Sequence, residues 1–320
     1  MMVALMANDY WKKRTQNIMD LLDIKDQELN AAVLKEYQSA LEDITRKIDD
    51  FYEKYAQDNT LSYADAIKRI RKTDLSDYVK RANAYRESNK DNPELLKRLN
   101  AQYLTAKINR LELLKLEVEF RILEASNAQV ESFTEYLAKE SAYIYGALAV
   151  GNAIRTLNNV EIDTILSFEW SGANYSERIW RDNDVLANKL KDVLVKAAIN
   201  GRNPRVTAKK LRDVFGGSKA NTERLVRTES TYVANATTAK RYRDYGVGSY
   251  EFVATLDNRT SSICRHLNGE VFKMSEFSPG TNAPAMHPNC RSTIAPSIDE
   301  LTKFNKYLDP DTVDDLPSWH

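Results

Sequence analysis

The chain has 320 residues, and its 46 lysines and arginines balance 46 aspartates and glutamates, so its formal net charge is zero. Apolar residues make up 42% and charged residues 29%, which excludes an intrinsically disordered chain. No stretch approaches about 18 consecutive apolar residues, so we expect no transmembrane helix. The N-terminus also lacks the basic-then-apolar pattern of a secretory signal. Two cysteines exclude a disulfide scaffold and fit a reducing compartment.

The first part of the chain has the pattern of long helices. Glycine is absent before Gly146, and Pro93 is the single proline before that position, so the strongest helix breakers are almost missing. Apolar residues recur every three or four positions over 29–55 and again over 95–125. Asn92-Pro93 is a helix-start signal between these stretches. The pattern predicts an extended, long-helix N-terminal domain over 8–150.

The middle of the chain, 151–248, is predicted to be helical but divided into shorter pieces. The segment from Trp170 to Trp180 reads as a turn that leads into a helix. A short helix is expected over 206–215, closed by Gly216-Gly217, because paired glycines destabilise a helix. A longer helix is expected over 221–245, ending at Gly246.

A strand pattern begins near residue 249. Apolar residues alternate with other residues over 250–256, the two-residue period of a half-buried strand. Asn268-Gly269 is a strong signal for a hairpin turn to a second strand at 271–272. We therefore expect a small α+β module over 249–296, followed by an acidic tail over 297–320. The predicted fold is mainly α, with elongated helical N-terminal and middle regions and this small C-terminal module.

The segment 201–250 is basic, with eleven lysines and arginines against four acidic residues, a local charge of +7. Such charges can bind DNA phosphates without reading the base sequence. An acidic protein partner or a solvated helix face are the alternatives. The candidate DNA contacts on the predicted helix are Arg224, Arg227, Lys240, Arg241 and Arg243.

Both cysteines and two of the three histidines lie within 27 residues, as Cys264, His266, His287 and Cys290. Zinc binds four nitrogen or sulfur ligands, often two from each of two loops, although Cys-x-His is a tighter spacing than usual. A disulfide between the cysteines, simple packing of buried thiols, and a nucleophilic pair of Cys264 with His287 are the alternatives. Phosphate-binding glycine loops, Gly-x-Ser-x-Gly and His-Glu-x-x-His are missing, so we expect no enzyme and no required cofactor, with zinc as the possible exception.

A string of motifs then resembles a known family. These are Arg224-Leu-Val-Arg-Thr-Glu-Ser-Thr-Tyr-Val-Ala-Asn-Ala, Asp257-Asn-Arg-Thr-Ser-Ser-Ile-Cys264, Leu267-Asn-Gly-Glu-Val-Phe272 and His287-Pro-Asn-Cys-Arg-Ser292. In this order they resemble the Mu F-like head morphogenesis family of tailed bacteriophages, most closely over 165–296. Upstream, Tyr10-Trp-Lys-Lys-Arg14 and the Trp170–Trp180 segment are similar to members from phages of Gram-positive hosts.

The resemblance implies a minor capsid protein inside the phage head, and host cytoplasm as the place of assembly. It implies association with the portal protein and with capsid or scaffold proteins, contact with viral double-stranded DNA, assistance in DNA packaging or ejection, and no membrane partner. Relatives often carry cysteines at the positions of Ser261 and Ser292, so a four-cysteine metal site is not expected in this chain. The competing hypotheses are a zinc-stabilised nucleic-acid-binding module and an enzyme using Cys264 and His287.

Overall fold

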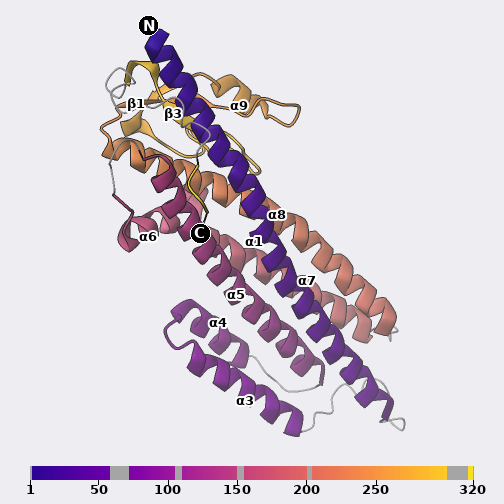
Figure 1. Ribbon diagram of the computed structural model, residues 1–320. Coiled ribbons are helices and arrows are strands. Elements are labelled where there is room, and N and C mark those ends of the chain that lie inside the picture. Colours follow the sequence, from indigo (N-terminus) through magenta and orange to yellow (C-terminus); the bar gives the residue numbers. More distant parts are fainter. Residues whose placement is uncertain are drawn as a thin grey trace. The chain divides into compact units, whose positions relative to one another are not determined.

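The structure, a computed structural model, describes residues 2–57, 72–104, 110–149, 155–199, 204–300 and 316–319. Helices dominate it, and one small antiparallel sheet is formed by strands from the C-terminal part of the chain (Figure 1). This confirms the predicted mainly α fold with a small α+β module. The elements are α1 (Met2–Gln57), α3 (Lys72–Ser88), α4 (Pro93–Leu104), α5 (Arg110–Ala147), α6 (Asn159–Ser167), α7 (Tyr175–Ile199), α8 (Pro204–Asp244), β1 (Ser249–Val253), α9 (Ser262–Leu267), β2 (Val271–Lys273) and β3 (Thr293–Pro296), with short 3-10 turns at Trp170–Gly172 and Met274–Glu276.

The chain divides into two compact units, each built from separate stretches of sequence. The first unit comprises Met1–Ala31, Ser132–Tyr175 and Thr222–His320, and the second comprises Ala32–Glu131 and Ser176–Asn221. Helices α1, α5 and α8 each contribute one part to each unit. The units therefore do not follow the consecutive segments 8–150, 151–248, 249–296 and 297–320 that the sequence suggested.

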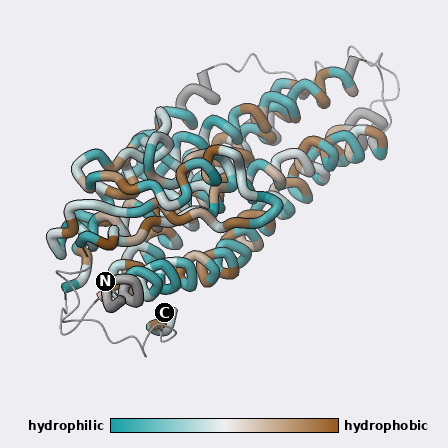
Figure 2. Tube along the Cα trace, turned by 90° about the horizontal axis from the view of Figure 1, so that it is seen from above, coloured by the Kyte–Doolittle hydropathy of each residue, from teal (hydrophilic) through white to brown (hydrophobic). Residues whose placement is uncertain are grey.

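The second unit is held by an apolar core between helices. Asn92 caps α4 by accepting a hydrogen bond from the Leu95 amide (3.1 Å), so the helix begins at Pro93 as predicted. Apolar and polar stretches alternate along the long helices (Figure 2), as expected for amphipathic helices that bury one face. The core residues are Tyr78, Ala82, Leu95, Leu99, Leu116, Phe120, Leu123 and Trp180.

The core of the first unit joins α1, α5, α8 and the sheet. Trp11 is 2% exposed and meets the ring of Tyr242 edge-on, with centroids 5.8 Å apart. Arg14 donates two hydrogen bonds to the carbonyl of Ala147 (3.1 and 2.9 Å), the last residue of α5. A cation at this position satisfies a helix carbonyl that has no partner within the helix. The ring of Trp319 lies 4.9 Å from that of Tyr143, so the end of the chain contacts this unit too.

The sheet has the strand order β2-β1-β3, with both pairings antiparallel. Tyr250 and Phe252 are fully buried, as the alternation predicted, whereas Leu256 lies beyond β1 and is 58% exposed. The expected two-residue hairpin is wrong, because α9 intervenes between β1 and β2. Asn268 and Gly269 instead end α9 and lead into β2, and Gly269 has the positive φ of 86° that made this pair a turn signal.

The predicted helix break at Gly216-Gly217 is also wrong. Helix α8 runs without interruption from Pro204 to Asp244, and the chain turns only afterwards, at Gly246 with φ of 74°. Glycine lowers helix stability by about 1 kcal/mol relative to alanine, a cost that packing of a long helix can exceed.

Replacing either helical glycine by alanine is therefore expected to stabilise the protein. An added Cβ at Gly216 or Gly217 meets no described atom within 4 Å, so the gain is about 0.5–1 kcal/mol each in the free energy of unfolding by urea. Gly246→Ala is the control and should destabilise, because alanine is strained at positive φ. Stabilisation by Gly246→Ala, or loss of stability at both helical positions, would contradict this assignment.

Two carboxyl groups are buried together in the first unit. Asp26 of α1 is 4% exposed and accepts a hydrogen bond from the Tyr136 hydroxyl (2.9 Å), and Glu140 of α5 is fully buried. Burial raises the pKa of Asp26 from its ordinary 3.8 to about 6, against the opposing effects of Tyr136, Ser230 and Arg227. Burial also raises the pKa of Glu140 well above its usual range.

Asp26→Asn is expected to stabilise the protein at pH 8. Between about pH 4 and pH 6 the folded state holds a proton that unfolded Asp26 has lost, so stability falls as pH rises through this window and stays lower above it. Removing the charge should restore about 1–3 kcal/mol at pH 8 and almost nothing at pH 4, measured by urea unfolding.

The matched control is Asp23→Asn. Asp23 is half exposed and pairs with Arg227 at 2.6 Å, so its loss should cost no more than about 1 kcal/mol. A decrease in stability of Asp26→Asn at pH 8 would show that the Asp26 carboxylate is stabilising.

Candidate functional site

One face of α8 contacts two of the sequence motifs described above, the segment that begins at Trp170 and the loop that begins at His287. Glu229 is 2% exposed and accepts a hydrogen bond from the indole nitrogen of Trp170 (3.0 Å). The Trp170 ring stacks on Tyr232, with centroids 5.3 Å apart, and the Tyr232 hydroxyl donates to the Ile165 carbonyl (2.9 Å). The segment before α7 is thus fixed to α8 by two buried hydrogen bonds and one aromatic stack.

The same helix binds the loop that carries the His-Pro-Asn-Cys motif. The Asn289 amide donates to the Thr228 hydroxyl (3.0 Å), and the Thr231 hydroxyl donates to the Cys290 carbonyl (2.6 Å). Asn235 donates to the Ser292 carbonyl (3.2 Å). These polar side chains lie on the buried face of α8, so their role is to satisfy the backbone of a loop that has few hydrogen bonds of its own.

A second contact fixes this loop to the segment before α9. Arg291 donates to Asp257 Oδ1 (2.7 Å), and this bond is the chief reason that the pKa of Asp257 lies well below its usual range. Asp257 also accepts the Arg259 amide (2.8 Å). The Asp-x-Arg-Thr motif and the Cys-Arg motif are therefore joined by the ion pair of Asp257 with Arg291. Their separation in sequence did not reveal this contact.

These contacts bring two thiols and one imidazole together. The Cys264 sulfur lies 3.8 Å from the Cys290 sulfur and 3.2 Å from His287 Nε2, and the three donor atoms are all within 4.8 Å of one another. Cys264 sits on α9, whose first turn is capped by Ser261, and Cys290 sits on the loop bound to α8. Both cysteines are buried and unpaired.

The polar surroundings of Cys264 favour its thiolate. The hydrogen bond with Cys290 is the main cause, and with those to Ser261, Ser292 and His287 it lowers the pKa of Cys264 below its usual range against the effect of burial. The same contact with Cys264, followed by burial, raises the pKa of Cys290. One thiol of the pair is therefore readily ionised and the other is not.

The fourth predicted metal ligand lies apart from this cluster. His266 is exposed on α9, and the cluster of the described residues contains Cys264, His287 and Cys290 only. Residues two positions apart on a helix do not share a face, so a Cys-x-His pair on α9 cannot direct both side chains to one ion. The structure thus corrects His266 and leaves three of the four predicted residues together.

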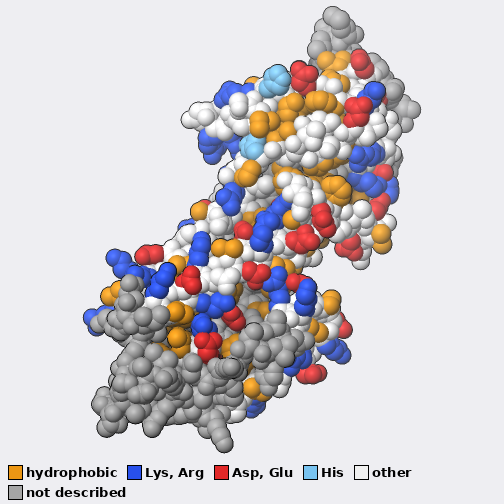
Figure 3. All heavy atoms as spheres, turned by 180° about the vertical axis from the view of Figure 1, so that it is seen from behind, with side chains coloured by type: hydrophobic (Ala, Val, Ile, Leu, Met, Phe, Trp, Pro, Cys, Tyr) orange, Lys and Arg blue, Asp and Glu red, His pale blue; other side chains and the backbone are white. Residues whose placement is uncertain are grey.

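The predicted DNA contacts have different surroundings. Arg227 pairs with Asp23 (2.6 Å), and Lys240 pairs with Asp244 (2.5 Å) and Glu161 (3.0 Å). On the face drawn in Figure 3, basic and acidic side chains are likewise interspersed. Two of the eleven basic residues of 201–250, Arg227 and Lys240, thus pair with acidic residues from other segments, Asp23 and Glu161.

The two remaining positions near the end of α8 differ from each other. Arg241 is 1% exposed, with its guanidinium 4.3 Å from the ring centroid of Tyr145 and 4.6 Å from that of Tyr245. A phosphate cannot reach it, so Arg241 is wrong as a DNA contact and is a packing residue. Arg243 and Arg224 are exposed, and the Arg243 guanidinium lies 5.2 Å from the Phe277 ring centroid.

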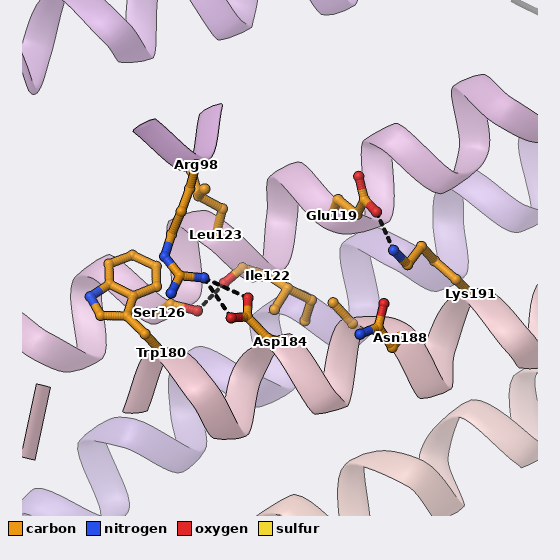
Figure 4. A pocket seen from close by; sticks show the side chains of 10 residues that line it. Arg98, Glu119, Ile122, Leu123, Ser126, Trp180, Asp184, Asn188 and Lys191 are labelled. Atoms are coloured by element: carbon orange, nitrogen blue, oxygen red, sulfur yellow. Dashed lines mark hydrogen bonds and ion pairs between the residues drawn. The ribbon is translucent and has the colours of Figure 1, made fainter. Parts of the chain in front are cut away.

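The second unit contains a pocket of about 460 Å³ that the sequence did not indicate (Figure 4). Arg98 donates two hydrogen bonds to Asp184 (2.6 and 2.7 Å) and lies over the Trp180 ring at 4.7 Å. Lys191 pairs with Glu119 on the same lining. Each of these charges faces an opposite one, so the pocket offers no charged group reserved for a ligand. Arg98 and Asp184 are 86 positions apart, too far for sequence spacing to relate them.

Comparison with known proteins supports the resemblance. Residues 188–295, from within α7 to within β3, match the family described as Phage Mu protein F like protein. This match supports a Mu F-like phage head protein. An uncharacterized protein of Haemophilus influenzae is 22% identical over 119 residues, which cover 37% of this chain and 27% of that protein. No solved structure gives a significant match.

Among the described residues, none of the helices combines the length and apolarity needed to cross a membrane.

Proposed function

We propose that the protein is a minor capsid protein of a tailed phage that acts in head morphogenesis at the portal vertex. The match of 188–295 to the Phage Mu protein F like family is the observation that carries this proposal. The proposed partners are the portal protein and capsid or scaffold proteins, and the proposed location is the interior of the virion after assembly in the host cytoplasm. The protein assists DNA packaging or ejection from there.

A structural role agrees with how the motif residues are used. Glu229, Thr228 and Arg291 contact other parts of the first unit and hold its segments together. Catalytic residues, in contrast, direct their polar atoms at a position that a substrate can occupy. We therefore propose a docking protein and no enzymatic activity.

The portal proposal is tested by co-expression with the portal protein of the same phage. The two chains should elute together in size-exclusion chromatography, and the protein should be present in purified heads. A matched variant, Glu229→Gln, keeps the size of the side chain but weakens its hydrogen bond to the Trp170 indole. A wild-type chain that is absent from heads and elutes apart from the portal would contradict the proposal.

Contact with double-stranded DNA is the second part of the proposal. It rests on Arg224 and Arg243, the two exposed arginines among the candidates on α8. Arg224→Ala with Arg243→Ala should weaken DNA binding equally for all sequences. It should reduce the slope of log affinity against log salt concentration by about 2, because each phosphate contact contributes about 0.9.

Two variants separate this effect from others. Arg46→Ala removes an exposed arginine of α1 outside the basic segment and should leave the salt slope unchanged. Arg241→Ala should lower the free energy of unfolding by about 2–4 kcal/mol, since two buried contacts with aromatic rings are lost. An unchanged slope in the double variant would contradict DNA contact and favour an acidic protein partner for this helix.

A further inference from the structure

The cluster of Cys264, His287 and Cys290 has the dimensions of a metal site. In a tetrahedral zinc site, with sulfur at about 2.3 Å and nitrogen at about 2.0 Å from the ion, two sulfurs lie about 3.8 Å apart and sulfur lies about 3.5 Å from nitrogen. The corresponding distances here are 3.8 Å between the sulfurs and 3.2 Å from Cys264 to His287. Two of the three donor separations thus match the edges of a coordination tetrahedron, and the third pair, Cys290 and His287, lies within 4.8 Å.

The imidazole is oriented for ligation. His287 Nδ1 lies 2.9 Å from the Pro288 carbonyl oxygen, an acceptor, so Nδ1 carries the hydrogen of the neutral ring. Nε2 is then the nitrogen that carries a lone pair, and it lies 3.2 Å from the Cys264 sulfur and 2.8 Å from the Ser261 hydroxyl oxygen. A hydrogen bond from the non-ligating nitrogen to a carbonyl is the usual support of a zinc-bound histidine, because it fixes the ring and its tautomer.

The backbone that carries the ligands is held in place independently of them. Cys264 is in the first turn of α9, where Ser261 accepts its amide (3.1 Å). The Cys290 carbonyl is bound by Thr231, and Arg291 is bound by Asp257. The ligands therefore come from two segments that are tied together, the arrangement found in zinc sites built on two loops.

We propose that Cys264, His287 and Cys290 bind one Zn²⁺ ion, and that an oxygen ligand beside Ser261 occupies the fourth position. Two thiolates and an imidazole form a soft donor set that suits zinc and excludes magnesium and calcium. Both sulfurs bind as thiolates, and any proton that a thiol still holds is released to solvent on binding. We place the fourth coordination position beside Ser261 because the Ser261 hydroxyl oxygen lies 2.8 Å from His287 Nε2. The inference does not depend on the function proposed above.

Metal analysis of the full-length chain tests the proposal. Protein loaded with Zn²⁺ and dialysed should retain about one equivalent, and its two thiols should react with a thiol reagent only after chelation. His266→Ala is the matched control and should retain the ion, whereas Cys290→Ser should lose it. Retention below a tenth of an equivalent by the wild type, or a loss of two mass units that reports a disulfide in the freshly purified protein, would overturn the proposal.

Cobalt substitution tests the ligand set without depending on a variant that fails to fold. Co²⁺ bound to the wild-type chain should show the sulfur-to-cobalt charge-transfer absorption of two thiolates and the visible bands of a tetrahedral site. Ser261→Cys should add a third thiolate, increase that absorption by about half and tighten zinc binding at least tenfold. An octahedral cobalt spectrum in the wild type would overturn the proposed site, and an unchanged spectrum in Ser261→Cys would overturn the assignment of the fourth position.

Discussion

The first unit depends on buried polar side chains of α8 that hydrogen-bond to segments distant in sequence. Glu229 binds the indole of Trp170, and Thr231 binds the backbone of Cys290, 59 residues further along the chain. A buried polar group left without a partner costs about 1–3 kcal/mol, so each contact stabilises one arrangement of the segments against all others. The small sheet has three short strands and would be marginal alone. Its position is set by this helix.

Helix type was predictable where the periodicity was strong, and so were some helix ends, whereas helix lengths were not. The start of α4 at Pro93 and the end of α8 before Gly246 followed from capping and breaker residues whose effects are local. The two errors in local structure have different causes. Gly216-Gly217 stayed helical because the packing of a long helix can exceed a glycine cost of about 1 kcal/mol. Asn268-Gly269 does turn the chain, but it leads from α9 into β2 and so does not join β1 directly to β2.

Three of the four residues predicted for the metal cluster lie together, and the fourth was not predictable because its position depends on helix geometry. The residue types identified Cys264, His287 and Cys290, but spacing could not show that α9 directs His266 elsewhere. The basic segment shows the same limit. Net charge of a stretch counts Arg241 like any other arginine, although the fold places it between two aromatic rings. The charge of a segment can be counted from the sequence, but the exposure of each charged side chain depends on residues that are distant in the sequence.

The first unit is assembled from separate stretches of the sequence, and this has a consequence for exchanging one stretch with that of another protein. The stretch that matches the family, 188–295, contains Glu229 and the threonines of α8 but neither Trp11 nor Trp170, which pack against this helix. Replacing that stretch alone with the corresponding stretch of a relative would place a foreign α8 against these two tryptophans. The replacement is compatible with the packing of the first unit only where the new helix keeps the surfaces that contact Trp11 and Trp170, although more than a hundred residues separate Trp11 from the start of the match.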